Sequence, residues 1–133
     1  MRILLIPLLL FISIGCFAKE KLWSQQVDTV LEGGKLFKMS FQEIERKDKY
    51  SIARVKFVSG PSVGSVMFVF DGFRNIAKQT GRKFMVPLDE WKDESGNKMY
   101  KFGFTDSNKV NIKQLFGSDI SPKIERAGLI PVN

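Results

Sequence analysis

The stretch from Ser51 to Leu88 most constrains the fold, because it orders a strand, a glycine-rich turn, a helix and a second strand. Across residues 63–80 the apolar residues recur at three- and four-residue steps, which is the spacing of one helix face. This stripe consists of Val63, Val66, Met67, Phe70, Phe73, Ile76 and Ala77. Gly81 supplies the left-handed residue at which helices commonly end. An apolar strand begins soon afterwards, so we expect the helix to fold back over a sheet.

Two predicted hairpins flank this helix. Residues 35–46 and 50–58 alternate apolar and polar side chains, as in half-buried strands. Residues 82–105 form a second apolar pair of strands around the turn cluster 93–97. A strand–helix–strand connection in one sheet is normally a right-handed crossover between parallel strands. The order ββαββ therefore predicts an α+β fold, with one mixed sheet of about four strands and a long amphipathic helix on one face.

The N-terminus has the three parts of a secretory signal peptide. Met1-Arg2 is positive, Ile3–Ile14 is an apolar run, and small residues end at Ala18. The run is shorter than the ~20 apolar residues that a membrane-spanning helix needs. We expect cleavage after Ala18, which leaves residues 19–133 as a single domain that is periplasmic or secreted.

An alternative outcome keeps Cys16. Ser13-Ile14-Gly15-Cys16 is similar to a bacterial lipobox, although Ser13 stands where a large aliphatic residue is usual. Processing there would remove residues 1–15 and leave Cys16 as a lipid anchor, the only membrane attachment that we expect. In either case the mature domain has no disulfide, because Cys16 is the only cysteine.

The net charge favours anionic partners. It is +7 for the chain and +6 once Arg2 leaves with the signal peptide. Lipid head groups, envelope glycans and acidic proteins all suit such a domain, and we expect no nucleic-acid partner. Solubility alone is the simpler explanation of the charge.

Four basic side chains point away from the apolar strand faces: Lys38, Arg54, Lys56 and Lys101. If the two hairpins share one sheet, these residues lie on its open side and form a cationic surface for carboxylate or phosphate groups. The alternative is that they discourage edge-to-edge pairing, which exposed lysines on strands commonly do.

The turn before the helix spells the nucleophile-elbow pattern, Gly60-Pro61-Ser62-Val63-Gly64. The chain contains no histidine, so a Ser–His–acid triad is impossible, and a hydrolase using Ser62 is a remote alternative. The simpler explanation is a turn in which Ser62 or Ser65 caps the helix. Free N–H groups at the helix start could also bind an anion beside Ser62, Gly64 and Ser65.

Metal and acid–base chemistry find little support. Without histidine and without a mature cysteine, the common zinc sites are excluded, and we expect no metal and no cofactor. Glu43 with Glu45, or Asp89 with Glu90, could supply a carboxylate pair, although adjacent acids are usually solvated. We therefore expect a protein that is not an enzyme.

The segment Ala77–Val86, following an amphipathic helix, resembles small bacterial envelope lipoproteins of unknown function, in which a helix ends in Gly and an aromatic-bearing strand follows. The resemblance covers about residues 50–90 and implies an envelope domain without catalytic residues. The expected function is that of a non-enzymatic exported protein that binds an anionic ligand, a lipid head group or glycan, or a protein partner. The alternative is an inhibitor or immunity-type protein.

Overall fold

The computed structural model describes residues 21–60, 62–117, 120–122, 126 and 128–133. The predicted signal peptide 1–18 and the candidate anchor Cys16 lie outside these residues. Within the described ranges, no helix combines the length and the apolar character needed to cross a membrane.

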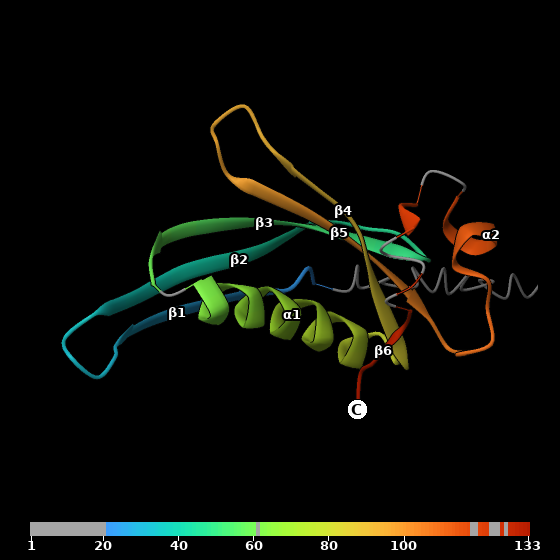
Figure 1. Cartoon of the computed structure of the whole chain (residues 1–133), viewed down its shortest axis with the longest axis horizontal. Coiled ribbons are helices and arrows are strands. Elements are labelled where there is room, and N and C mark those ends of the chain that lie inside the picture. Colours follow the sequence, from blue (N-terminus) through green and yellow to red (C-terminus); the bar gives the residue numbers. More distant parts are fainter. Residues whose placement is uncertain (1–20, 61, 118–119, 123–125, 127) are drawn as a thin grey trace, which may run out of the picture.

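The described residues form one curved sheet of six strands in the order β1-β2-β3-β5-β4-β6, with helix α1 beneath it (Figure 1). All five neighbouring pairs are antiparallel. The strands are β1 (Ser24–Val30), β2 (Leu36–Arg46), β3 (Tyr50–Ser59), β4 (Phe84–Lys92), β5 (Lys98–Thr105) and β6 (Ile130–Pro131).

The predicted fold class is wrong, because the protein is mostly β and its sheet is a six-stranded antiparallel half-barrel, not a mixed sheet of four strands. The expected crossover between parallel neighbours does not occur, since β5 lies between β3 and β4 and pairs with both. Prediction also missed the two edge strands. The strands predicted within residues 35–58 and 82–105 include neither β1 nor β6.

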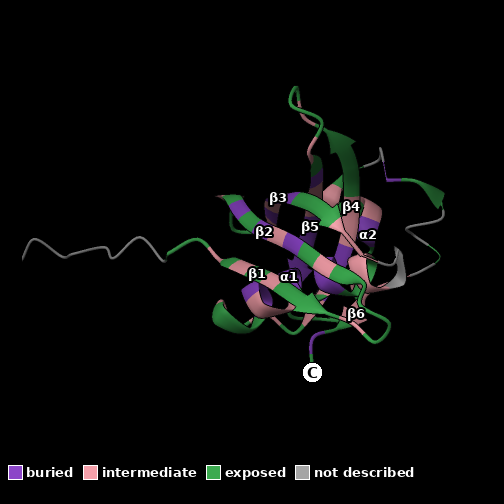
Figure 2. Cartoon of the chain, turned by 90° about the vertical axis from the view of Figure 1, so that its left-hand side faces the viewer, coloured by how far each residue is buried: buried purple, intermediate pink, exposed green. Residues whose placement is uncertain are grey.

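Helix α1 (Ser62–Gln79) covers the inner face of the sheet. Phe73 is fully buried there, and its ring meets Phe41 of β2 edge-on with centroids 5.1 Å apart. Gly72 allows this approach, because a Cβ at Gly72 would lie 2.5 Å from the Phe41 ring. Gly81, with a φ of 72°, follows the end of the helix. Figure 2 shows the buried side of α1 turned toward buried segments of the sheet.

The first turns of α1 differ from the predicted stripe. Val66 and Met67, predicted to face the sheet, are 54% and 53% exposed, whereas Phe68 and Val69 are buried in the core. Residues 66–70 are all apolar, so their spacing alone cannot decide which of them face the sheet. This shift leaves Val66 free to contribute to the surface described below.

A smaller core lies on the other face of the sheet, under helix α2 (Ile112–Phe116). Val86 of β4 is fully buried there together with Ile112. Gly103 of β5 makes room for Phe116, since a Cβ at Gly103 would lie 2.5 Å from that ring. The central strand β5 is therefore covered on both faces near its C-terminal end.

Candidate ligand-binding hollow at the start of helix α1

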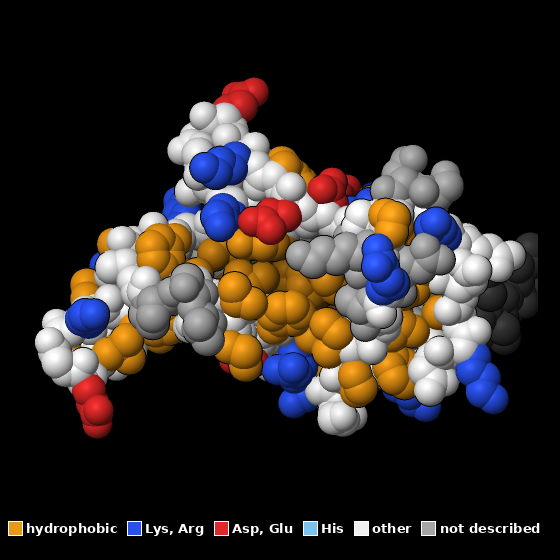
Figure 3. Space-filling view, in the orientation of Figure 1, with side chains coloured by type: hydrophobic (Ala, Val, Ile, Leu, Met, Phe, Trp, Pro, Cys, Tyr) orange, Lys and Arg blue, Asp and Glu red, His pale blue; other side chains and the backbone are white. Residues whose placement is uncertain are grey.

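A hollow of about 480 Å³ lies on the inner side of the sheet, where the first turns of α1 face the β4–β5 hairpin. In Figure 3 a hydrophobic surface is visible below the charged side chains of that hairpin. The lining residues come from β2, β3, β5, α1 and the hairpin: Met39, Val55, Phe57, Gly60, Ser65, Val66, Lys92, Gly96, Asn97, Lys98 and Tyr100. We call this feature the apolar hollow.

The floor of the apolar hollow is hydrophobic and open to solvent. Met39 and Val55 are buried beneath it, whereas Phe57 is 51% exposed and Val66 is 54% exposed. Phe57 lies opposite Met39 in the β2–β3 register, so it continues the apolar inner face of the sheet beyond the part that α1 covers. Exposed apolar surface in a concave site is typical of ligand pockets, which commonly have volumes of about 300–1,000 Å³.

The rim of the apolar hollow carries two lysines. Lys92 and Lys98 face each other across the hairpin, and Lys98 Nζ lies 3.7 Å from Glu90 Oε1. Glu90 also lies directly opposite Tyr100 in the β4–β5 register. Desolvation, followed by the negative charge of Glu90, raises the pKa of Tyr100 above its ordinary value, so this hydroxyl remains a neutral donor at neutral pH. The rim therefore combines two cations with one carboxylate.

The tip of the hairpin is held in place by Asp93. Its Oδ1 accepts hydrogen bonds from the backbone N–H groups of Ser95 (3.0 Å) and Asn97 (2.8 Å). Its Oδ2 lies 3.2 Å from Arg54 Nε of β3. Desolvation acts to raise the pKa of Asp93, but the hydrogen bonds from Asn97 and Ser95 and the Arg54 charge outweigh it and lower the pKa. These contacts fix the position of Asn97 and Lys98 at the rim.

The sequence predicted an anion site at the start of the helix, formed by Ser62, Gly64 and Ser65. Of these three residues, Ser65 lines the apolar hollow. Gly64 is half-buried in the first turn of α1, and Ser62 begins the helix, although its side chain lies outside the described part. The first turn of α1 and the two rim lysines thus border the same hollow. Sequence reasoning named the first element of this arrangement and missed the second.

The predicted cationic surface is divided. The strand register places Lys38, Arg54, Lys56 and Lys101 on the outer face of the sheet. Lys38 Nζ lies 4.0 Å from Asp28, Arg54 is paired with Asp93, and Lys101 Nζ lies 4.3 Å from the centroid of the Tyr50 ring. Lys56 is exposed on β3. Local partners thus take up three of the four side chains, and Lys101 lies in the middle of β5, on the face of the sheet opposite to Lys98.

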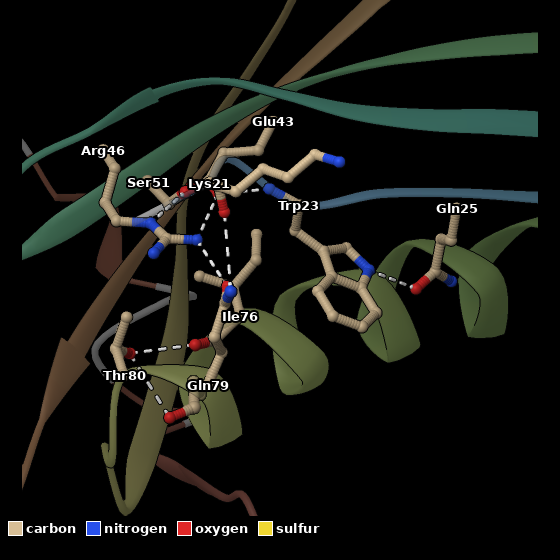
Figure 4. A network of polar contacts seen from close by, with 10 residues as sticks. Lys21, Trp23, Gln25, Glu43, Arg46, Ser51, Ile76, Gln79 and Thr80 are labelled. Atoms are coloured by element: carbon tan, nitrogen blue, oxygen red, sulfur yellow. Dashed lines mark hydrogen bonds and ion pairs between the residues drawn. The ribbon is translucent and has the colours of Figure 1, made fainter. Parts of the chain in front are cut away.

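The carboxylate of Glu43 is part of a buried structural network (Figure 4). It accepts hydrogen bonds from Arg46 (2.6 and 3.0 Å), from the Ser51 hydroxyl (2.6 Å) and from the backbone N–H of Trp23 (2.9 Å). Its partner in the proposed carboxylate pair, Glu45, is directed instead toward Lys47, with an Nζ–Oε1 distance of 3.9 Å. The Glu43 carboxylate therefore has no free oxygen position to offer a substrate, and its role is to join β1, β2 and β3.

Comparisons add no further assignment. No protein-family model, curated protein or solved structure matches the chain. In the described part, no three His, Cys, Asp or Glu side chains are grouped so that they could hold a metal ion. A function for the apolar hollow can therefore be inferred only from the residues that line it.

The key residues of the hollow could be found in the sequence only with the strand order in hand. Lys92 and Lys98 flank the predicted turn 93–97, but nothing local shows that this hairpin stands beside β3. Phe57 alternates with Lys56 as a core residue would, yet it lies beyond the region that the helix covers. The sequence feature that could have indicated the rim of the hollow is the pair of lysines, Lys92 and Lys98, at the two ends of a hairpin turn.

Proposed function

We propose that this chain is a non-enzymatic exported envelope protein that binds a single-chain anionic amphiphile, such as a fatty acid or a lysophospholipid, in the apolar hollow. The observation that carries the proposal is the exposure of Phe57 and Val66 on a concave floor between the helix start and two rim lysines. Export is supported by the signal peptide predicted over residues 1–18.

The chemistry of the hollow favours an acyl chain over a glycan. An alkyl chain laid on Phe57 and Val66 would remove apolar surface from water, which is worth about 0.8 kcal/mol for each buried CH₂ group. A glycan needs several polar side chains that read its hydroxyl groups, whereas the floor here is formed by aliphatic and aromatic side chains. Lys92 and Lys98 lie where the acidic head group of such an amphiphile would emerge from the hollow.

The test is isothermal titration of the exported protein with lysophosphatidylglycerol below its micellar concentration. Phe57→Glu puts a charge on the apolar floor and should abolish binding. Val58→Glu is the matched control, because Val58 is the next residue on β3, is 63% exposed and is not part of the hollow. Equal affinities of the wild-type protein and Phe57→Glu, or no binding by the wild type, would overturn the proposal.

The head-group requirement is tested separately. Exposed ion pairs are worth about 0.2–1 kcal/mol each, so Lys92→Glu with Lys98→Glu should weaken lysophosphatidylglycerol binding by about tenfold. The same double variant should bind zwitterionic lysophosphatidylcholine almost as the wild type does. If both lipids lost affinity equally, the lysines would act on the shape of the hairpin and not on the head group.

A further inference from the structure

The outer face of the sheet carries a second surface, at the end of the molecule away from the apolar hollow. Here the β2–β3 turn, β5 and helix α2 surround a depression of about 520 Å³. Its floor contains Leu88, Leu115 and Phe116, all half-buried, beside the ring of Tyr50. Three lysines border it: Lys47, Lys49 and Lys101. We call this feature the lysine groove.

The positive charge of the lysine groove is only partly compensated. Its one acid, Asp48, is bound to Arg82, which donates to the Asp48 carbonyl (2.6 Å) and carboxylate (3.1 Å). Lys47 has a long contact of 3.9 Å to Glu45, and the two side chains are 58% and 43% exposed. Lys101 is held over the Tyr50 ring, a contact that orients the ammonium group without neutralising it. Exposed pairs of this kind are weak, so the groove keeps a net positive field.

The described chain begins at the same end of the molecule. Lys21 accepts a hydrogen bond from Gln79 near the end of α1, and Trp23 is bound to Glu43 (Figure 4). Arg46 links Glu43 to Gln79 and directly precedes Lys47 of the groove. A tether at Cys16 would therefore reach the folded domain a few residues before this basic end.

We propose that the lysine groove is a docking surface for an anionic phospholipid membrane. Lys47, Lys49 and Lys101 would contact lipid phosphates, and a lipid head group would occupy the depression above the half-buried Leu115 and Phe116. A membrane fits better than an acidic protein, because this basic surface lies at the end of the domain where a lipid tether at Cys16 would arrive, and clustered lysines beside an anchor bind anionic lipid surfaces. A single acyl anchor gives only marginal membrane binding, and a basic patch at the anchored end supplies the second signal. The proposal is independent of ligand binding in the apolar hollow.

The test is co-sedimentation of the exported protein with vesicles of phosphatidylglycerol and phosphatidylcholine, compared with vesicles of phosphatidylcholine alone. Each lysine near an anionic surface contributes about 1 kcal/mol, so Lys47→Glu, Lys49→Glu and Lys101→Glu together should lower partitioning by about a hundredfold. The matched control is Lys35→Glu, Lys38→Glu and Lys56→Glu, which changes net charge equally at exposed positions toward the other end of the molecule. This control should retain most of the binding.

Two further measurements separate folding from docking. Lys47→Glu with Lys49→Glu leaves the contact of Lys101 with Tyr50 intact and should still lose most of the anionic-vesicle binding, with an unchanged melting temperature. Lysophosphatidylglycerol affinity at the apolar hollow should not change in any groove variant. Equal losses in the groove and control variants would show a non-specific charge effect, and an unchanged groove variant would show that this face is not used. Either result overturns the proposal.

Discussion

The phenyl ring of Phe73 stacks on that of Phe102, with ring centroids 4.0 Å apart and planes inclined by 8°. Phe73 belongs to α1 and Phe102 to the central strand β5, so this pair joins the helix to the middle of the sheet. Phe41 meets the same Phe73 ring from β2. One side chain thus connects both halves of the sheet to the helix.

Phe73→Ala should lower the free energy of unfolding by about 3–5 kcal/mol, because it leaves a cavity at a fully buried site. Met67→Ala is the control on the same helix, since Met67 is 53% exposed and should change stability by less than about 0.5 kcal/mol. Urea unfolding followed by circular dichroism measures both. Similar values for the two variants would contradict the packing described for α1.

Gly72→Ala should destabilise the protein, although alanine is the better helix former by about 1 kcal/mol. The added Cβ would lie 2.5 Å from the buried Phe41 ring, so the helix or the ring must move. Phe41→Leu in the same chain provides space, and the effect of Gly72→Ala should then become smaller. Thermal unfolding of the double-mutant cycle tests this coupling, and strictly additive effects would rule it out.

Glu43→Gln should cost about 3–5 kcal/mol, the usual effect of breaking a buried ion pair by removing one partner. The side chain of Glu43 is inaccessible, and that of its partner Arg46 is 13% exposed. Glu45→Gln provides the comparison two residues away, where the pair with Lys47 is exposed and worth at most about 1 kcal/mol. Urea midpoints that fell equally in the two variants would mean that the buried Glu43 network contributes no more to stability than the exposed Glu45–Lys47 pair.

Asp93 should make the β4–β5 hairpin sensitive to acid. Its pKa in the folded protein is below the ordinary value of 3.8, so its stabilising contribution is present above that value and is lost as the pH falls through the folded pKa. Amide exchange at Ser95 and Asn97 should therefore accelerate at acid pH relative to the sheet core. Asp93→Asn should remove this pH dependence, and a hairpin that loosened equally in both proteins would exclude Asp93 as its source.

The helix was the most predictable part of this chain, and the sheet was the least. The spacing of Phe73, Ile76 and Ala77 marks a buried face, and Gly81 marks the end of the helix, so α1 lies close to the predicted residues 63–80. Strand order depends instead on contacts between distant residues. Nothing in residues 82–105 indicates that β5, and not β4, pairs with β3.

Strands β1 and β6 and the apolar hollow could not be predicted from the sequence, for related reasons. Strand β1 is exposed along much of its length, so its sequence has little of the alternation that identifies a half-buried strand. The apolar hollow combines Phe57, Val66 and Lys98 from three elements, and only the folded arrangement brings them together. Ser65 could be predicted as a site residue, because a glycine-rich turn before a helix indicates where the N–H groups of a helix start lie.

The placement of β5 also determines when this protein can finish folding. Strands β1 to β3 form a local meander, but the second half of the sheet is joined to it through pairs such as Tyr50 with Gly103 and Val55 with Lys98. These contacts span α1 and β4, and such high contact order slows folding. The sheet cannot close until the residues of β5 have been synthesised, after those of β1 to β4. If the protein is exported as we propose, its N-terminus could reach the membrane before β5 is available to complete the sheet.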